Sequence, residues 1–248
     1  MQSPYSISII TICFNCKEQL RRTIASVSSQ TYPEVEYIVV DGGSTDGSLQ
    51  IIEEAHQAGI VTRYISEPDH GIYDAMNKGL RMATMDYLCF MNAGDTFHSP
   101  ETLSKALGAI SPNSYPTVIY GETNLVDHEG QFIKRRELRA PKKLTASSFR
   151  KGMLVCHQSF YALRSRAPLY DESYRFSADY DWCLKILEQP GCTTHNTQLV
   201  LTDYLHEGLT TQNRWVSLKE RFEIMKRHYG ILPTLLSHLY FLLRYPFK

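Results

Sequence analysis

Residues 37–47 read YIVVDGGSTDG, an apolar run that passes into a glycine-rich turn. Residues 37–40 are typical of a buried strand, and the two glycines after Asp41 allow the chain to turn tightly. Ser44 or Thr45 is then placed to cap a helix. The apolar side chains of that helix recur at helical spacing, at Leu49, Ile52 and Ala55. This stretch therefore predicts a strand that leads directly into a helix.

The same alternation of strands and helices is predicted on both sides of this stretch. Further strands are expected over residues 6–12, 62–65 and 87–91, and further helices over 16–30 and 72–83. Asn15 is the predicted N-cap of the first helix, because Glu18 follows three residues later as in a capping box. Strands separated by helices indicate an α/β fold with a mostly parallel sheet, in which ligands bind at the carboxyl ends of the strands. Asp41 and Asp95 each follow a strand, so we expect both carboxylates on one rim of the sheet.

The second part of the chain is less regular. A strand is expected over residues 118–120, a turn over 127–130, and helices over 180–187 and 217–229. Ser217 and Glu220 form a second capping-box pattern at the start of the last of these helices. Because the sequence contains no linker-like stretch, we predict one domain over residues 1–215, followed by a C-terminal helical extension over 216–248.

Composition excludes some classes of function. The 248 residues include 26 Lys and Arg and 26 Asp and Glu, so the chain has no overall positive field that would attract nucleic acid. Binding of an anion must therefore depend on a local site. Cys13, Cys89 and Cys183 lie inside apolar runs, as reduced core cysteines do. The sequence shows neither a signal-peptide pattern nor an apolar run long enough to span a membrane, so we expect a reduced, cytoplasmic protein.

Two of the predicted strand-to-helix junctions carry polar motifs. The turn over residues 41–47 leads into a helix N-terminus, which suits an anion, and Asp46 there is alternatively a simple partner of the helix dipole. Residues 67–79 read EPDHGIYDAMNKG and are dense in polar groups for such a junction. Lys78 in this motif either reaches a phosphate or is an ordinary exposed lysine.

Two further motifs place carboxylates where chemistry is expected. Residues 92–95 read NAGD, which puts an amide and a carboxylate just past a strand, and oxygen ligands of this kind suit Mg²⁺. Residues 176–182 read FSADYDW, so that Asp179 stands at a helix start among aromatic side chains. A carboxylate in this position acts as a general base, or Ser177 or Asp179 merely caps the helix.

The motifs at residues 41–47, 67–69, 71–79 and 92–95 resemble, in this order, those of glycosyltransferase family 2. Within that family they are similar to bacterial polysaccharide enzymes related to the colanic acid glycosyltransferases. The resemblance covers roughly residues 5–215. It implies a GT-A fold, with a nucleotide-sugar half over about residues 1–115 and an acceptor half over about 116–215. It also implies an inverting transfer of a sugar from a nucleoside-diphosphate sugar to a glycan or lipid-linked acceptor hydroxyl in surface polysaccharide biosynthesis.

The same resemblance implies roles for single residues. The donor-binding residues are expected to be Phe14, Asp41, Asp69, Lys78 and Asn92, with Phe14 near the base and Asp41 on the base or ribose. Asp95 is expected to hold Mg²⁺ or Mn²⁺ on the donor diphosphate, and His206 is either a second metal ligand or a surface loop residue. Asp179 matches the family's catalytic base, which removes the proton of the acceptor hydroxyl. His157 and Gln158 resemble a pair that lines the acceptor side.

The sequence departs from the family pattern at three places. The usual metal motif is Asp-x-Asp, whereas Asn92 and Gly94 stand at those positions here and Asp95 alone is acidic. Ala178 replaces a common Glu beside the catalytic Asp, and Lys185 stands where Arg is usual. A general base and a cation on the leaving diphosphate together suit displacement by a weakly nucleophilic sugar hydroxyl, so metal dependence remains the expectation.

The C-terminal extension carries one apolar helical stripe. Its members are Leu232, Leu235, Leu236, Leu239, Leu242 and Leu243, with the basic residues Lys226, Arg227, Arg244 and Lys248 around it. One interpretation is peripheral contact of residues 232–248 with the anionic inner face of the cytoplasmic membrane. The other is packing of the stripe on the domain itself or on a second subunit in a homodimer.

Three other functions fit parts of the sequence. A non-catalytic nucleotide-sugar-binding protein would account for the missing acids at Asn92 and Gly94. A sugar nucleotidyltransferase would also use a parallel sheet and a carboxylate-bound metal, but it needs a Gly- and basic-rich N-terminal loop that residues 9–16 lack. A redox protein is suggested by Cys13 and Cys16 at a strand-to-helix junction, although it leaves the acidic motifs unexplained.

Overall fold

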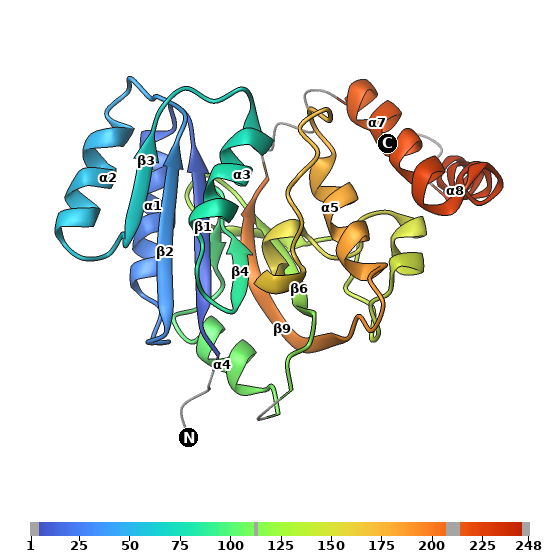
Figure 1. Cartoon of the computed structure of the whole chain (residues 1–248), viewed down its shortest axis with the longest axis horizontal. Helices are drawn as coiled ribbons and strands as arrows, with labels where there is room; N and C mark the ends of the chain where they lie inside the picture. The colour runs from blue at the N-terminus through green and yellow to red at the C-terminus, as the bar shows by residue number, and fades with distance from the viewer. Residues whose placement is uncertain (1–4, 112–113, 207–213, 245–248) are drawn as a thin grey trace.

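The computed structural model describes residues 5–111, 114–206 and 214–244, and it confirms an α/β fold (Figure 1). The strands of the first half are β1 (Ile7–Cys13), β2 (Val35–Asp41), β3 (Arg63–Ser66) and β4 (Tyr87–Phe90). Helices α1 (Lys17–Ser28), α2 (Ser48–Gln57) and α3 (Ile72–Met82) connect them. β1 pairs in parallel with β2 and β4, and β2 pairs in parallel with β3, so the parallel arrangement predicted for this half is confirmed.

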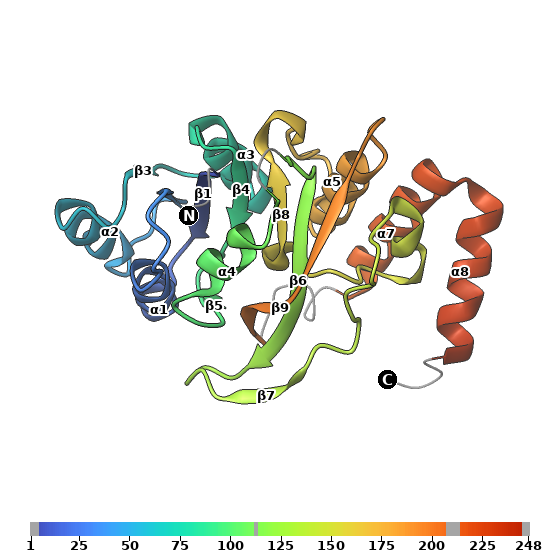
Figure 2. The ribbon, with the colours of Figure 1, turned by 90° about the horizontal axis from the view of Figure 1, so that it is seen from below.

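The second half extends the same sheet with strands of mixed direction (Figure 2). Its strands are β5 (Thr96–Phe97), β6 (Val118–Val126), β7 (Phe132–Arg135), β8 (Phe160–Leu163) and β9 (Thr194–Leu205). Its helices are α4 (Thr102–Gly108), α5 (Ala178–Leu187) and the short 3₁₀ helices η1 (Ala146–Lys151), η2 (His157–Ser159) and η3 (Arg164–Arg166). The sheet order is β3-β2-β1-β4-β8-β6-β9-β5, with β7 beside β6. Because β8 runs antiparallel to β4 and β6, one continuous sheet joins the two halves.

Helices cover both faces of the sheet, and each face has its own apolar core. On one face α3 and α5 pack on the strands, where Met76 and Trp182 are buried. On the other face α1, α2 and α4 pack, with Leu20, Ile52 and Leu103 buried. Burial on two faces explains why β1 is a nearly continuous apolar run that is buried along its whole length.

Two predicted helix caps in the first half are wrong, because their side chains bond elsewhere. α1 begins at Lys17, and Asn15 before it adopts a left-handed backbone (φ 48°). The Asn15 Oδ1 atom instead accepts a hydrogen bond from the backbone N–H of Thr45 at 2.8 Å. α2 begins only at Ser48, whose backbone N–H donates to Asp46 Oδ1 at 2.9 Å. The bond between Asn15 and Thr45 joins the two strand-to-helix turns to each other.

The capping box predicted at Ser217 is also wrong. Helix α7 (Arg214–Tyr229) begins three residues earlier, and Ser217 lies buried inside it, with its hydroxyl 3.1 Å from that of Ser177. Glu220 accepts hydrogen bonds from the backbone N–H groups of Arg175 and Phe176 at 2.8 and 2.9 Å. The two polar residues therefore fasten α7 to the segment that leads into α5.

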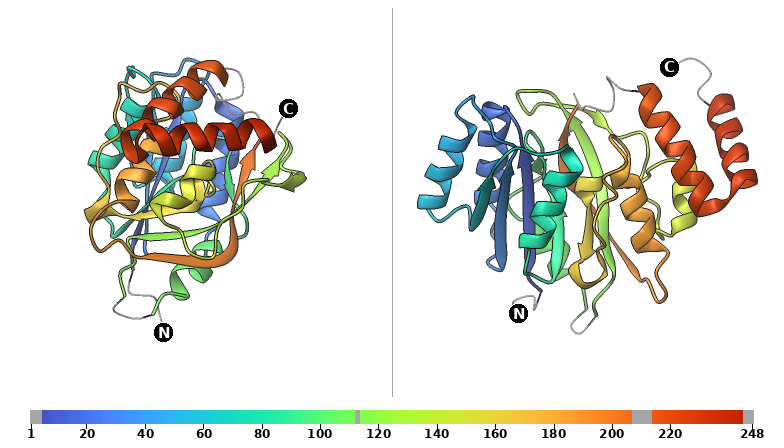
Figure 3. Two further views of the ribbon diagram at one scale, coloured as in Figure 1. Left: turned by 90° about the vertical axis from the view of Figure 1, so that its right-hand side faces the viewer. Right: turned by 45° about the horizontal axis from the view of Figure 1, so that its top comes forward.

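The C-terminal helices lie at one end of the molecule. Helix α7 packs beside α5, and α8 (Ile231–Arg244) packs on α7 and η1 (Figures 1 and 3). In the left panel of Figure 3, where this end faces the viewer, α8 runs across the front of the molecule. Among the described residues, no helix is both long and apolar enough to cross a membrane.

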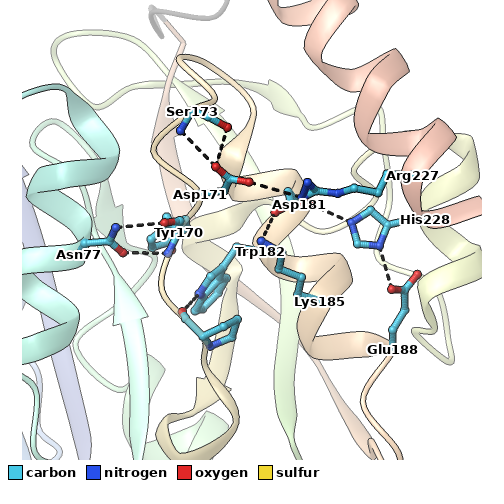
Figure 4. A network of polar contacts seen from close by, with 11 residues as sticks. Asn77, Tyr170, Asp171, Ser173, Asp181, Trp182, Lys185, Glu188, Arg227 and His228 are labelled. Atoms are coloured by element: carbon cyan, nitrogen blue, oxygen red, sulfur yellow. Dashed lines mark hydrogen bonds and ion pairs between the residues drawn. The ribbon is translucent and has the colours of Figure 1, made fainter.

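A buried carboxylate on α5 is the polar anchor of α7 (Figure 4). Asp181 Oδ1 lies 2.8 Å from His228 Nε2 and 3.2 Å from an Arg227 nitrogen, and Asp181 Oδ2 lies 2.7 Å from Lys185 Nζ. The other ring nitrogen of His228 lies 2.8 Å from Glu188 Oε2. Both partners of the ring are carboxylates, which accept hydrogen bonds, so the arrangement favours a doubly protonated imidazolium. Burial alone would lower the pKa of His228, but its bonds to Asp181 and Glu188 outweigh burial and raise it.

Replacement of Gly79 by Ala is expected to destabilise the fold. A Cβ at Gly79 would lie 2.4 Å from Ile10 Cγ2, because α3 rests directly on β1. The clash should lower the free energy of unfolding by about 1–3 kcal/mol, despite the better helix propensity of Ala. Gly108→Ala in α4 is the matched control, since nothing lies within 4 Å of its Cβ position. Urea denaturation of both variants checks this, and equal midpoints would contradict it.

The charged state of His228 should make stability depend on pH. A group whose pKa is raised on folding adds stability that is complete below its unfolded pKa of about 6.5 and is lost as the pH rises through the folded value. We therefore expect the wild-type protein to lose this stability as the pH rises above about 6.5. His228→Gln should remove this part of the dependence. Denaturation midpoints over this pH range test it, and parallel curves for the two proteins would exclude the role.

Candidate active site

Asp41, at the end of β2, is buried and fully hydrogen-bonded. Its Oδ2 accepts from the Ser44 backbone N–H at 3.0 Å and from Ser66 Oγ on β3 at 2.6 Å. Its Oδ1 accepts from Ser44 Oγ and, at 3.5 Å, from Cys13 Sγ on β1. The carboxylate thus joins the carboxyl ends of three parallel strands. The neighbouring Cys16 and burial raise the pKa of the Cys13 thiol, whereas the bond to Cys13 lowers the pKa of Cys16.

Phe14, Gly42 and Asp69 lie together above this anchor. The Phe14 side chain follows β1 and is 63% exposed, which leaves an aromatic ring free on the rim. A Cβ at Gly42 would lie 2.8 Å from Asp69 Oδ2 and 3.3 Å from Phe14 Cδ2. Glycine therefore lets these two side chains approach each other, since a Cβ at this position would displace the Asp69 carboxylate.

Lys78 is engaged in a cluster of acids. Its Nζ lies 2.6 Å from Asp69 Oδ1, 3.0 Å from Glu67 Oε1 and 3.3 Å from Asp74 Oδ2. Burial alone would lower the pKa of Lys78, but these three carboxylates outweigh it, and the pKa is raised. Three acids around one ammonium group leave this part of the rim negative, so Lys78 orients Asp69 here instead of presenting a free cation.

Asp95 lies just past β4 in a buried position. Its Oδ1 accepts from the Leu205 backbone N–H at 3.0 Å, and its Oδ2 accepts from Gln158 Nε2 at 2.7 Å. Burial raises the pKa of Asp95 to about 7, against the lowering effect of these two bonds. Gly94 beside it has a φ of 101°, and a Cβ there would lie 2.8 Å from Leu205 Cδ2. A side chain at this position would be strained by the backbone and would press on Leu205.

The chain offers few protein ligands for a metal ion. Within the described ranges no three His, Cys, Asp or Glu residues gather in a way that could hold one. The Oδ1 atom of Asn92 is buried and has no hydrogen-bond partner, so an acceptor oxygen is left over beside the Asp95 motif. One carboxylate and one amide oxygen fit Mg²⁺, which commonly takes its other ligands from phosphate and water. His206 is exposed, and its part in metal binding stays a prediction.

Asp179 stands in the first turn of α5 and is half-buried. Its Oδ1 accepts a hydrogen bond from Tyr73 Oη on α3 at 3.3 Å and from the Tyr180 backbone N–H at 2.9 Å. The Tyr73 ring stacks on that of Tyr170, with centroids 5.6 Å apart. Asn77 fixes the Tyr170 backbone from α3, accepting from its N–H at 2.8 Å and donating to its C=O at 3.1 Å (Figure 4). An acid at the helix start is therefore held from two sides.

The neighbours His157 and Gln158 in η2 serve different carboxylates. Gln158 contacts Asp95, as above. His157 Nε2 lies 2.6 Å from the hydroxyl of Tyr170, whose ring stacks on Tyr73 beside Asp179. Burial lowers the pKa of His157 to about 4, so its imidazole is neutral near pH 7 and shares one hydrogen bond with the Tyr170 hydroxyl. The predicted pair is thus buried support for the site, and η2 connects the two acids.

The pKa values of Cys156 and Tyr204 are sensitive to both Asp95 and Asp179. The pKa of each side chain is raised by burial first and then also by the negative charges of both carboxylates. Both acids therefore act on the same two groups.

Sequence reasoning missed Tyr73, Asn77 and Tyr170 as supports of Asp179. Asn77 carried a signal, since it is a polar residue on the buried side of α3, whereas Tyr170 carried none.

Comparisons with known proteins agree with this geometry. The family model described as "Glycosyl transferase family 2" matches residues 8–169. The chain is 32% identical over 190 residues to an uncharacterized glycosyltransferase of Mycobacterium tuberculosis, covering 75% of this chain and 70% of that protein. It is 28% identical to a PGL/p-HBAD biosynthesis glycosyltransferase of Mycobacterium bovis, covering 81% and 77%.

Solved structures share the architecture. The mannosyltransferase PcManGT from Pyrobaculum calidifontis, in complex with GDP-Man and Mn²⁺, superposes with a TM-score of 0.65 at 17% identity, covering 96% of this chain and 70% of that one. Its likeness shows the fold alone. With the family model matched over more than half of its residues, the chain belongs to glycosyl transferase family 2 and is a glycosyltransferase with a GT-A fold.

Proposed function

We propose that this glycosyltransferase moves a sugar, with inversion, from a nucleoside-diphosphate sugar to the hydroxyl of a saccharide or lipid-linked acceptor. The observation that carries the proposal is Asp179, a half-buried carboxylate held by Tyr73 and the α5 backbone and linked through η2 to the Asp95 motif. A relative named for glycolipid biosynthesis and a similar fold in complex with GDP-Man and Mn²⁺ support it. The product class is accordingly a surface polysaccharide or glycolipid.

The first half of the chain, about residues 1–115, binds the donor in this proposal. The exposed Phe14 ring stacks on the base, and Asp69, oriented by Lys78, accepts hydrogen bonds from the base or ribose. Asp41 supports the nucleoside indirectly in this proposal and does not hydrogen-bond the base or ribose, as the motif had suggested. Since its oxygens already accept bonds from Ser44, Ser66 and Cys13, it holds the turn on which the nucleoside rests.

Asp95 and Asn92 would hold Mg²⁺ or Mn²⁺ on the donor diphosphate. A bound divalent cation supplies charge stabilisation for the leaving diphosphate. Gln158 and the Leu205 amide fix the Asp95 carboxylate, so its direction is set before donor binding. The orphaned Asn92 oxygen is the second protein ligand in this proposal.

The acceptor hydroxyl reacts beside Asp179. The acceptor oxygen forms a bond to the anomeric carbon, the bond from that carbon to the diphosphate oxygen breaks, and the hydroxyl proton passes to Asp179. One displacement of this kind inverts the anomeric configuration. Tyr73 keeps one carboxylate oxygen oriented, while residues of the second half, about 116–215, surround the acceptor.

Asp179→Asn should remove the proposed proton acceptor and leave the donor site intact. We expect kcat to fall by about 10²–10⁴-fold, with donor affinity unchanged. The measurements are nucleoside-diphosphate release in the presence of acceptor and calorimetric donor binding. Asp171→Asn, an acid on the preceding loop outside the proposed machinery, is the control and should retain transfer. Full activity of Asp179→Asn would refute the role, and donor binding without release in the wild type would favour a non-catalytic binding protein.

Removal of divalent cations with EDTA should stop transfer, and Mg²⁺ or Mn²⁺ should restore it. Asp95→Asn removes the proposed anionic ligand with almost no change of shape, so it should weaken Mn²⁺ binding in the presence of nucleoside diphosphate by at least about tenfold. Calorimetry measures that binding without turnover. Undiminished transfer in EDTA would show that the enzyme works without a metal.

A further inference from the structure

The leucines of α8 point away from the rest of the molecule. Leu232, Leu236 and Leu243 are 71%, 67% and 75% exposed. Leu235, Leu239 and Leu242 are likewise exposed and complete the stripe. The predicted packing of this stripe on the domain is therefore wrong for the chain as the structure describes it. We call these six leucines the α8 face.

The inner side of α8 is polar and aromatic. Thr234 is buried, with its hydroxyl donating to the Gly230 C=O at 2.7 Å, and His238 packs edge-on against Phe222 of α7 at 5.1 Å between ring centroids. A helix that packs on its own domain normally turns its apolar side inward. α8 has the reverse arrangement, which indicates that its leucines contact something outside the chain.

Basic residues border the α8 face. Residues 224–248 contain no Asp or Glu and include Arg244 and Lys248. Lys226 and Arg227 in the same stretch are ion-paired with Glu223 and with Asp171 and Asp181, so they add no net charge to the patch. Lys248 lies outside the described residues, so it and Arg244, whose side chain is not described, count here as charges of the sequence. Helix η1, on which α8 packs, adds the exposed residues Arg150 and Lys151. A surface that complements this patch must be both apolar and anionic.

We propose that the α8 face docks on an anionic lipid surface. An interfacial helix buries its apolar side at the headgroup boundary while basic residues contact anionic headgroups. A second copy of the chain fits less well, because a symmetric contact would bring the same basic residues of two copies together. Docking itself needs no transfer activity, whereas the consequence that the acceptor is lipid-linked rests on the proposed function.

The attachment of α7 makes this surface relevant to catalysis. Arg227 and His228 hold α7 to Asp181, two residues after Asp179 on α5. α8 in turn packs on α7. A bilayer that binds α8 is therefore held in a fixed relation to the proposed base, which suits an acceptor presented from the membrane.

Vesicle co-sedimentation of the full chain tests the docking. Wild-type protein should sediment with phosphatidylglycerol-containing vesicles, less with pure phosphatidylcholine, and less at high ionic strength. The variant Leu236→Gln/Leu239→Gln/Leu243→Gln should lower the partition coefficient by about tenfold or more. Its positions are exposed, so folding should be retained and is checked by thermal unfolding.

Phe132→Gln/Ile133→Gln on β7 is the matched control, since it removes exposed apolar side chains elsewhere and should bind vesicles like the wild type. Equal sedimentation of the wild type and the α8 variant, or no binding to anionic vesicles, would overturn the proposal. So would a wild-type dimer that the α8 variant dissociates in sedimentation velocity. Asp179→Asn should still bind vesicles, which separates failure of docking from failure of the proposed transfer.

Discussion

The rim of the sheet depends on one buried carboxylate. Asp41 ends β2 and accepts hydrogen bonds from Cys13 on β1 and Ser66 on β3. It also accepts from the backbone N–H and the hydroxyl of Ser44. A carboxylate removed from water must have its oxygens satisfied, and here the strand ends and the turn supply every donor. The turn is thereby fixed where Gly42 lets Phe14 and Asp69 approach each other. The surface that we propose binds the nucleoside follows from this packing.

A second constraint joins the two halves of the site. In η2, Gln158 contacts Asp95 and His157 supports the Tyr170 and Tyr73 pair beside Asp179. η2 leads directly into β8, which pairs with β4 of the first half and with β6 of the second. The spacing between the proposed metal motif and the proposed base is therefore set by the sheet itself. A rigid spacing of this kind suits the proposed single displacement, in which both groups would act at once.

Local patterns in the sequence predicted the elements better than their ends. The order of strands and helices through residue 91 and the position of Asp179 at a helix start are confirmed, because apolar period and turn residues are local signals. The caps failed at Asn15, Ser44, Thr45 and Ser217. Asn15, Thr45 and Ser217 bond to partners far away in the sequence, which local spacing does not reveal. Ser44 bonds back to Asp41, three residues before it. Lys78 is a different case, because its three acids belong to its own motif. Asp74 is its i,i+4 neighbour on α3, whereas Glu67 and Asp69 meet it only once the preceding loop has folded.

Periodicity also predicted α8 without saying which side would face inward. An apolar stripe lowers free energy equally by packing on protein or by leaving water for lipid, so the stripe alone is ambiguous. The neighbouring helix decides between the two. Arg227 and His228 of α7 bind Asp181 on α5, and Phe222 of α7 contacts His238 of α8. The polar side of α8 is therefore the side that packs inward. The leucines then remain outside, beside basic residues and without acids nearby in sequence, as an interfacial helix requires.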